Sequence, residues 1–148
     1  MNEFQKIFKN KILLAPMEDV TEPPFRLISR RLGADIVYTE FISAEGLIRD
    51  ARKARAKLFF YEEERPVSIQ IFGGNEDVLV EAAKISESVN PDFIDINCGC
   101  WVKDVALRGA GAGLLRDIPK MTRIAEKVIG NIKLPVTLKT RLGWDENS

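Results

Sequence analysis

Short apolar segments alternate along the sequence with longer amphipathic ones, and this alternation allows few architectures. The apolar segments have the length of strands and are residues 11–16, 35–39, 67–72, 92–97 and 136–141. The amphipathic segments have the length of helices and are residues 23–32, 44–60, 75–89 and 118–129. Strands separated by helices are typical of a parallel sheet built from βαβ units. The sequence therefore predicts an α/β fold, with the sheet either open or closed into a barrel.

The helical segments carry terminus signals. Pro23 and Pro24 open the first one, because proline fits the first helical turn, and Gly33 follows it as a C-cap. Asn75 can cap the helix that follows Gly74, and Gly130 follows the last one. These residues fix where the helices should begin and end.

Three of the predicted strands have one apolar and one polar side at period two. The polar positions are Ser68 and Gln70; Asp95 and Asn97; and Thr137, Lys139 and Arg141. A sheet covered by helices on both faces should instead be apolar throughout. Polar sides that converge need a ligand or each other, since a buried unpaired polar group costs about 1–3 kcal/mol. The interior and mouth of a TIM (β/α)8 barrel meet that requirement, so we predict the barrel rather than the open sheet.

Composition excludes several classes of function. The chain has no histidine, which excludes a histidine-based triad, a histidine general base and histidine metal ligands within it. Its net charge is +0, so nucleic-acid binding would have to rest on a local patch. Its two cysteines, Cys98 and Cys100, are too close in sequence to staple the fold. With no signal-peptide pattern and no apolar run long enough for a membrane span, we expect a cytoplasmic protein with reduced thiols.

Residues able to do chemistry gather where the predicted strands end. They are Pro16 and Met17, Gln70, Asn97, the turn at residues 98–100, Lys139 and Arg141. Barrel enzymes place their sites at the carboxyl ends of strands. Cys100 could be a small buried hydrophobic residue, but its place on such a loop favours a catalytic role. Two sulfurs without histidine make a metal site a weak interpretation, and we predict no metal.

Three further features of the sequence are each open to two interpretations. Lys139 could reach solvent, or its parity could point it into the barrel to stabilise an anion. Residues 108–116 (RGAGAGLLR) could be a phosphate loop, although an active-site loop leading into a short helix fits better. Residues 49–57 (RDARKARAK) could be a solvated helix face or a contact for a nucleic-acid backbone.

Five motifs together resemble the tRNA-dihydrouridine synthases, in order and spacing over essentially the whole chain. They are residues 14–26 (LAPMEDVTEPPFR), 67–74 (VSIQIFGG), 93–100 (FIDINCGC), 108–117 (RGAGAGLLRD) and 135–145 (PVTLKTRLGWD). The resemblance implies an FMN-binding TIM-barrel enzyme with a C-terminal helical domain. It implies reduction of uridine in tRNA to 5,6-dihydrouridine, with NADPH recharging the FMN.

Carried over residue by residue, the resemblance assigns the site. The FMN-binding positions would be Pro16, Met17, Glu18, Gln70, Asn97 and Lys139. Cys100 would be the proton donor, and Arg141 and Lys103 are candidate substrate contacts. The implied chemistry is hydride transfer from flavin N5 to uracil C6 and protonation of C5 by the thiol, with Lys139 stabilising the anionic reduced flavin.

The sequence departs from the family in two respects. Trp101 follows Cys100 where the family has proline, which would fix that turn. The family also runs to roughly twice the length, and its later strands carry a substrate-side histidine and the FMN phosphate site. We therefore expect residues 1–148 to be the N-terminal part of the catalytic domain, with about five of eight barrel strands.

The alternatives are an inactive fragment that folds as a partial barrel or assembly unit, and another FMN-dependent oxidoreductase of the pyrimidine type. Exposed strand edges pair readily, so we expect the chain to self-associate if it exists alone.

Overall fold

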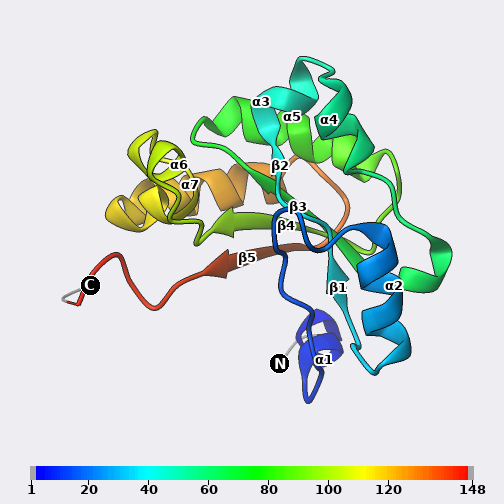
Figure 1. Cartoon of the computed structure of the whole chain (residues 1–148). Coiled ribbons are helices and arrows are strands. Elements are labelled where there is room, and N and C mark those ends of the chain that lie inside the picture. The colour runs from blue at the N-terminus through cyan, green and yellow to red at the C-terminus, as the bar shows by residue number, and fades with distance from the viewer. Residues whose placement is uncertain (1–2, 147–148) are drawn as a thin grey trace.

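A curled parallel sheet forms the centre of the computed structural model, which describes residues 3–146 (Figure 1). Its strands are β1 (Val37–Tyr38), β2 (Ile42–Ser43), β3 (Val67–Phe72), β4 (Phe93–Cys98) and β5 (Val136–Thr140). The order is β1-β3-β4-β5, and β2 pairs with β3 beyond the end of β1. All of these pairings are parallel. The predicted α/β class is confirmed, and the sheet has the form of a half-barrel.

Helices cover the outer face of the sheet (Figure 1). The α-helices are α1 (Glu3–Phe8), α2 (Pro23–Arg31), α3 (Ala44–Ile48), α4 (Arg52–Ala56), α5 (Glu76–Glu87), α6 (Lys103–Leu107) and α7 (Ile118–Ile129). Two 3-10 helices, η1 (Glu62–Glu64) and η2 (Gly111–Arg116), complete the elements. The apolar sides of β3 and β4 pack under α5 and α7 in one buried cluster. None of the described helices is both long and apolar enough to span a membrane.

The caps that the sequence predicts are present at α2 and α5. Asn75 accepts a hydrogen bond from the backbone N–H of Val78, at 3.1 Å, and so caps α5. Gly33, just past α2, has a φ of +106°, a conformation that glycine adopts at little cost. Both helices therefore begin and end where local chemistry favours it.

Residues 11–16 do not form the predicted strand. They make one isolated parallel bridge, between Leu13 and Ile36, with the Leu14 N–H donating to the Ile36 carbonyl at 2.9 Å. In a parallel ladder the next donor on this segment would be residue 16, two positions further on. Residue 16 is proline, which has no N–H, so the ladder cannot continue.

The single helical region predicted at residues 44–60 is wrong in detail, because α3 and α4 are separate. Asp50 lies between them with a φ of +56°, a left-handed conformation that interrupts a right-handed helix. Its carboxylate accepts a hydrogen bond from the Arg55 guanidinium at 2.5 Å, which ties the break to α4.

A buried ion pair joins the segment before β3 to α2. Arg26 donates to the Glu64 carboxylate, and both side chains are almost fully buried. The Arg26 guanidinium also donates to the carbonyls of Thr21, at 2.6 Å, and Phe59, at 3.0 Å. Glu64 in turn accepts from the backbone N–H of Tyr61 at 2.9 Å. This one guanidinium therefore ties three stretches of chain together.

We expect Glu64→Gln to lower the free energy of unfolding by about 3 kcal/mol, because it leaves the Arg26 charge buried without a counter-charge. Urea unfolding would measure the change. Glu63→Gln, at the exposed neighbouring position, is the matched control and should change stability by less than about 0.5 kcal/mol. Equal effects of the two substitutions would contradict the role of the buried pair.

Candidate functional site

The inner face of the curled sheet carries the polar side chains that the sequence places on one side of each strand. In the strand register, Gln70 is the partner of Asp95, Asp95 of Thr137, and Asn97 of Lys139. Partners in a parallel sheet share a face, so these side chains stand next to one another. The predicted period-two alternation is therefore confirmed on β3, β4 and β5.

These polar side chains satisfy each other. Gln70 Nε2 donates to Asp95 Oδ2 at 2.6 Å, and Asn97 Nδ2 donates to Gln70 Oε1 at 3.0 Å. The Thr137 hydroxyl donates to the other Asp95 oxygen, Oδ1. The backbone N–H of Gln70 donates to the Thr39 hydroxyl at 3.1 Å. Gln70, Asp95 and Asn97 are buried in this network.

The same network reaches the turn that carries Cys100. Asn97 Oδ1 accepts from the backbone N–H groups of Gly99, at 3.1 Å, and Cys100, at 2.9 Å. Arg141, just after β5, donates through Nε to the Gly99 carbonyl at 2.6 Å. The Cys100 carbonyl accepts from the Ala112 N–H at 2.8 Å. Two predicted site residues, Asn97 and Arg141, thus hold the turn that contains a third, Cys100.

The two cysteines lie in different environments. Cys98 is 0% exposed, and burial together with the charge of Asp95 raises the pKa of its thiol to about 12. Cys100 is partly exposed at the end of the strand. Of the two thiols, only that of Cys100 is therefore accessible to a molecule from outside the fold.

The glycine-rich segment at residues 108–116 folds as η2 and packs against the Cys100 turn. A Cβ on Gly111 would lie 2.7 Å from the Cys100 carbonyl oxygen, and a Cβ on Gly113 would lie 2.2 Å from that of Ala106. Neither distance is possible for a real side chain, so the glycines serve close packing. The short helix favoured over a phosphate loop is present.

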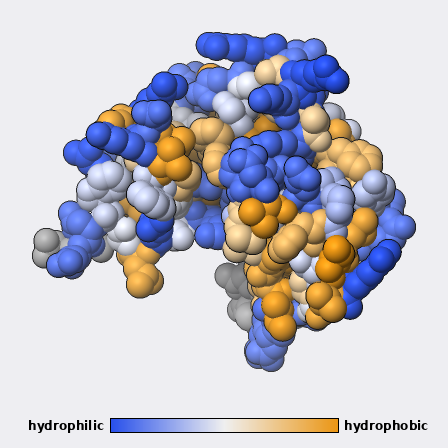
Figure 2. All heavy atoms as spheres, viewed as in Figure 1, coloured by the Kyte–Doolittle hydropathy of each residue, from blue (hydrophilic) through white to orange (hydrophobic). Residues whose placement is uncertain are grey.

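A hollow of about 470 Å³ opens on the inner side of the sheet. Figure 2 shows the molecule concave between the segment after β5 and the N-terminal part. Pro16 and Lys139, both predicted cofactor contacts, line this hollow, with Tyr38, Asp95 and Thr137 also in its wall. Its remaining lining is apolar and includes Phe8, Leu13, Leu14 and Leu138.

Seven of the nine predicted site residues are not among those that line this hollow. Four of them, Gln70, Asn97, Cys100 and Arg141, belong to the network and the turn described above, and the other three lie elsewhere. Glu18 is ion-paired with Lys57 at 2.5 Å and lines a separate cavity beside α4. Met17 is exposed, with its N–H donating to the Thr21 hydroxyl at 3.1 Å. Lys103 is exposed at the start of α6, on the chain that follows Cys100.

Asp95 is a site residue that sequence reasoning missed. It is 1% exposed, and burial raises the pKa of its carboxyl group to about 6, against the hydrogen bonds from Gln70 and Thr137 and the charge of Lys139. The pKa of the Tyr38 hydroxyl is raised mainly by burial of that side chain and further by the charge of Asp95. The sequence shows that Asp95 lies on the polar side of its strand. It does not show which residues Asp95 contacts, because these depend on the register of the neighbouring strands.

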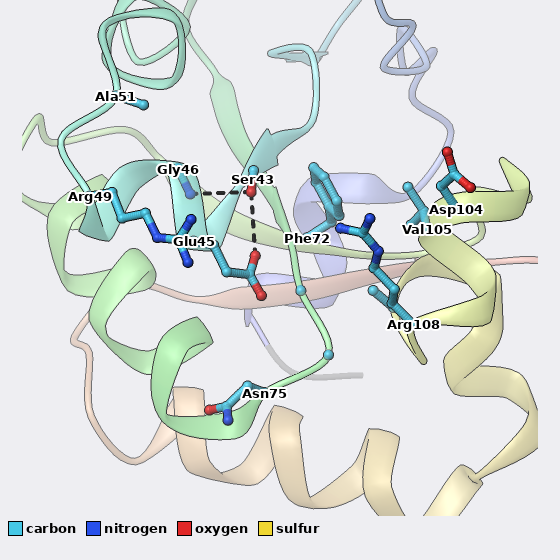
Figure 3. Close-up of a pocket in the computed structure, with 13 residues that line it drawn as sticks. Ser43, Glu45, Gly46, Arg49, Ala51, Phe72, Asn75, Asp104, Val105 and Arg108 are labelled. Atoms are coloured by element: carbon cyan, nitrogen blue, oxygen red, sulfur yellow. Dashed lines mark hydrogen bonds between the residues drawn. The ribbon is translucent and has the colours of Figure 1, made fainter.

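A second cavity, of about 820 Å³, lies at the carboxyl ends of β2 and β3 (Figure 3). Arg49 enters it from the end of α3 and Arg108 from the end of α6. The guanidinium groups point inward from two sides, with Phe72 beside that of Arg108. Glu45 also lines the cavity and accepts a hydrogen bond from the Ser43 hydroxyl at 3.3 Å.

The basic residues of the 49–57 stretch divide into two groups. Arg55 pairs with Asp50, and Lys57 pairs with Glu18 and Glu40. Among the described residues, Arg49, Arg52 and Lys53 have no carboxylate within ion-pair distance, and neither does Arg108. Of these cations, Arg49 and Arg108 line the second cavity, and Lys53 lines the neighbouring cavity beside α4.

Comparison with known proteins gives a consistent result. The family model described as "Dihydrouridine synthase (Dus)" matches residues 13–148. The tRNA-dihydrouridine synthase B of Pseudomonas aeruginosa is 41% identical over 139 residues, which is 94% of this chain and 42% of that protein. A probable tRNA-dihydrouridine synthase of Aquifex aeolicus is 40% identical over 143 residues, 94% of this chain and 45% of that protein. The chain thus spans less than half the length of these curated relatives.

We expect the free energy of unfolding of the wild-type chain, measured relative to that of the Asp95→Asn variant, to fall as pH rises. Because the carboxyl pKa is about 6 in the fold against 3.8 as its ordinary value, the stability that neutral Asp95 contributes is present below about pH 4 and lost as pH rises through 6. The difference between the two proteins should change by about 3 kcal/mol between these limits.

Urea unfolding at about pH 4, 5, 6 and 7 would measure this difference. Asp104→Asn is a control that removes an exposed carboxylate from the same half of the chain. A wild-type to Asp95→Asn difference that stays constant over this pH range would show that burial does not set the titration of Asp95.

Proposed function

Because the chain belongs to the dihydrouridine synthase family, we propose that it is the N-terminal part of the catalytic domain of a tRNA-dihydrouridine synthase. The complete enzyme would use FMN, recharged by NADPH, to reduce the C5=C6 bond of a uridine in tRNA. The observation that carries the proposal is the turn at Cys100. One partly exposed thiol is held at the carboxyl ends of adjacent strands, beside Gln70, Asn97 and Arg141.

The residues around the inner hollow fit a flavin ring. The lining of the hollow is mostly apolar and includes Pro16, and its polar groups are Tyr38, Asp95, Thr137 and Lys139. Apolar lining with a few placed polar groups is typical of cofactor sites. Bound FMN would supply the hydride for uracil C6. Lys139 would hold a positive charge at the edge of the hollow and favour the anionic form of the reduced ring.

Cys100 would move a proton in this reaction. Its Sγ–H would donate to C5 of the uracil while the adjacent carbonyl carries negative charge. Asn97 would keep the thiol in place by accepting the N–H groups of two successive peptides, those of Gly99 and Cys100. Cys98 cannot share the role, because it is fully buried in the core.

The cavity of Figure 3 would serve the tRNA. Arg49 and Arg108 point into it, and neither has a carboxylate within ion-pair distance in the part of the chain that the structure describes; Lys53 lines the neighbouring cavity beside α4. Arginine is the residue best suited to bind phosphate in a bidentate geometry. We propose that these cations contact backbone phosphates that flank the target uridine. Because the net charge of the chain is +0, such binding has to rest on a local group of cations like this one.

Replacement of the thiol tests the proposed chemistry. We expect Cys100→Ala to lower dihydrouridine formation by about 100-fold or more, because the general acid is lost. The measurement uses a chimera in which this chain replaces the matching part of the Pseudomonas aeruginosa enzyme, expressed in cells without other dihydrouridine synthases, with mass spectrometry of the tRNA. Flavin absorbance of the purified chimera should stay unchanged. Cys98→Ala is the matched control and should keep most of the activity.

Replacement of the free arginines tests the proposed tRNA contact. We expect Arg49→Gln combined with Arg108→Gln to weaken tRNA binding by the chimera by about tenfold at low salt and to flatten its salt dependence. Arg55→Gln removes a cation that is paired with Asp50 and should have less effect. An equal loss in both variants would indicate a general charge effect instead of contacts in this cavity.

A further inference from the structure

Trp101 directly follows the proposed proton donor, and its side chain stands in solvent. It is 72% exposed, and Cys100 beside it is itself partly exposed. Among residues 3–146, the Trp101 indole makes no aromatic contact, cation–π contact or hydrogen bond. A large aromatic side chain therefore lies next to the accessible thiol without a partner in the described part of the fold.

The other tryptophan of the chain has a structural contact. Trp144, in the segment after β5, is 40% exposed, and the Arg116 guanidinium lies 5.2 Å from the centre of its ring. This contact joins the segment after β5 to η2. Trp101 makes no comparable link, so packing within the described residues does not account for a tryptophan at this position.

The backbone on both sides of Trp101 is fixed, although its ring is not packed. Before it, the Cys100 N–H donates to Asn97 and the Cys100 carbonyl accepts from Ala112. After it, the Val102 carbonyl accepts from two backbone N–H groups of α6, at 2.9 and 3.0 Å. The indole thus projects from a well-held stretch of chain. A ligand that packs on it would meet a preorganised surface, which lowers the entropy lost on binding.

Cations lie on either side of Trp101 along the turn. Lys103, two positions later, is exposed, and Arg141 donates through Nε to the carbonyl of Gly99, two positions earlier. In the part of the chain that the structure describes, neither cation has a carboxylate within ion-pair distance. An exposed aromatic ring among cations is typical of sites for single-stranded nucleic acid, where bases stack on the ring and phosphates meet the cations.

We propose that Trp101 is a substrate-binding residue whose indole stacks on an RNA base next to the uridine that is reduced. Flavin and thiol must reach C6 and C5 of the uracil ring, so that base has to leave its stack. A neighbouring base then exposes a face, and an aromatic ring beside the thiol can cover it. The stacking is inferred from the placement of Trp101, whereas its part in uridine reduction rests on the proposed function.

Two simpler explanations of an exposed tryptophan make different predictions. A contact with phosphate alone would depend on Lys103 and Arg141 and would not need the ring. A contact with another protein segment would be served by any apolar side chain of similar size, such as leucine. Stacking on a base requires an aromatic ring, so phenylalanine should replace Trp101 and leucine should not.

The first measurement uses the chain itself, with Trp144→Phe so that Trp101 is its only indole. A base that stacks on an indole quenches its fluorescence. The titrants are a single-stranded RNA octamer and an abasic ribose–phosphate octamer of the same charge, at low salt. We expect the RNA to quench the fluorescence by about half or more at saturation, and the abasic strand by less than about a tenth. Equal quenching by both strands, or none by the RNA, overturns the proposal.

The second measurement is kcat/KM for tRNA in the chimera with the Pseudomonas aeruginosa enzyme. Trp101→Phe should lower kcat/KM by less than about threefold, and Trp101→Leu by about tenfold or more, because only the first keeps a ring for stacking. Leu107→Ala shortens another exposed apolar side chain, at the end of α6, and is the matched control that should have no effect. Equal values for the phenylalanine and leucine variants would overturn the stacking role.

The experiments separate this proposal from the proposed function. If Cys100→Ala abolishes dihydrouridine formation but RNA and the abasic strand quench Trp101 equally, the stacking role is overturned and the thiol chemistry stands. If RNA alone quenches Trp101 but the Cys100→Ala chimera remains active, the thiol chemistry is overturned and the RNA contact at Trp101 stands.

Discussion

The buried, mutually hydrogen-bonded side chains on the inner face of the sheet are the constraint on which the rest of the structure depends. A parallel strand covered on one side by helices still has a second side, and in β3, β4 and β5 that side is polar. Gln70, Asp95 and Asn97 are too deeply buried to rely on bulk water, so each must be satisfied by another. The strand register meets this need by placing Gln70 opposite Asp95.

The same alternation produces both the core and the site. Ile69, Ile71, Ile94 and Ile96 alternate with the polar positions and are fully buried under α5 and α7. The polar positions between them, Gln70 and Asp95, lie on the inner face of the sheet. A substitution that shifted the register of one strand by a single residue would exchange the two sets of side chains. Fold and candidate site are therefore specified by one feature of the sequence and cannot be separated by local changes.

The sequence predicts well the strands that show period-two alternation and the helix ends that carry a capping residue. The strands at Gln70, Asp95 and Lys139 and the cap at Asn75 are found within a residue or two. The strand at residues 11–16 fails because Pro16 removes one ladder donor, a detail that apolar content does not reveal. The break at Asp50 depends on a side-chain bond to Arg55. The two hydrogen bonds that the Asp95 carboxylate accepts come from residues 25 positions before it and 42 positions after it in the sequence.

Cys98 and Cys100 show that residue type alone does not determine the environment of a side chain. They lie two positions apart, yet one is a core side chain with its pKa raised to about 12 and the other stands at the edge of the sheet. The difference arises because β4 ends at Cys98 and Gly99 begins the turn. Beyond that point Asn97, Arg141 and Ala112 hold the backbone by four hydrogen bonds, two of which are made by Asn97. Two of these residues lie on other segments, so a thiol placed this way requires the sheet and η2 to be in place first.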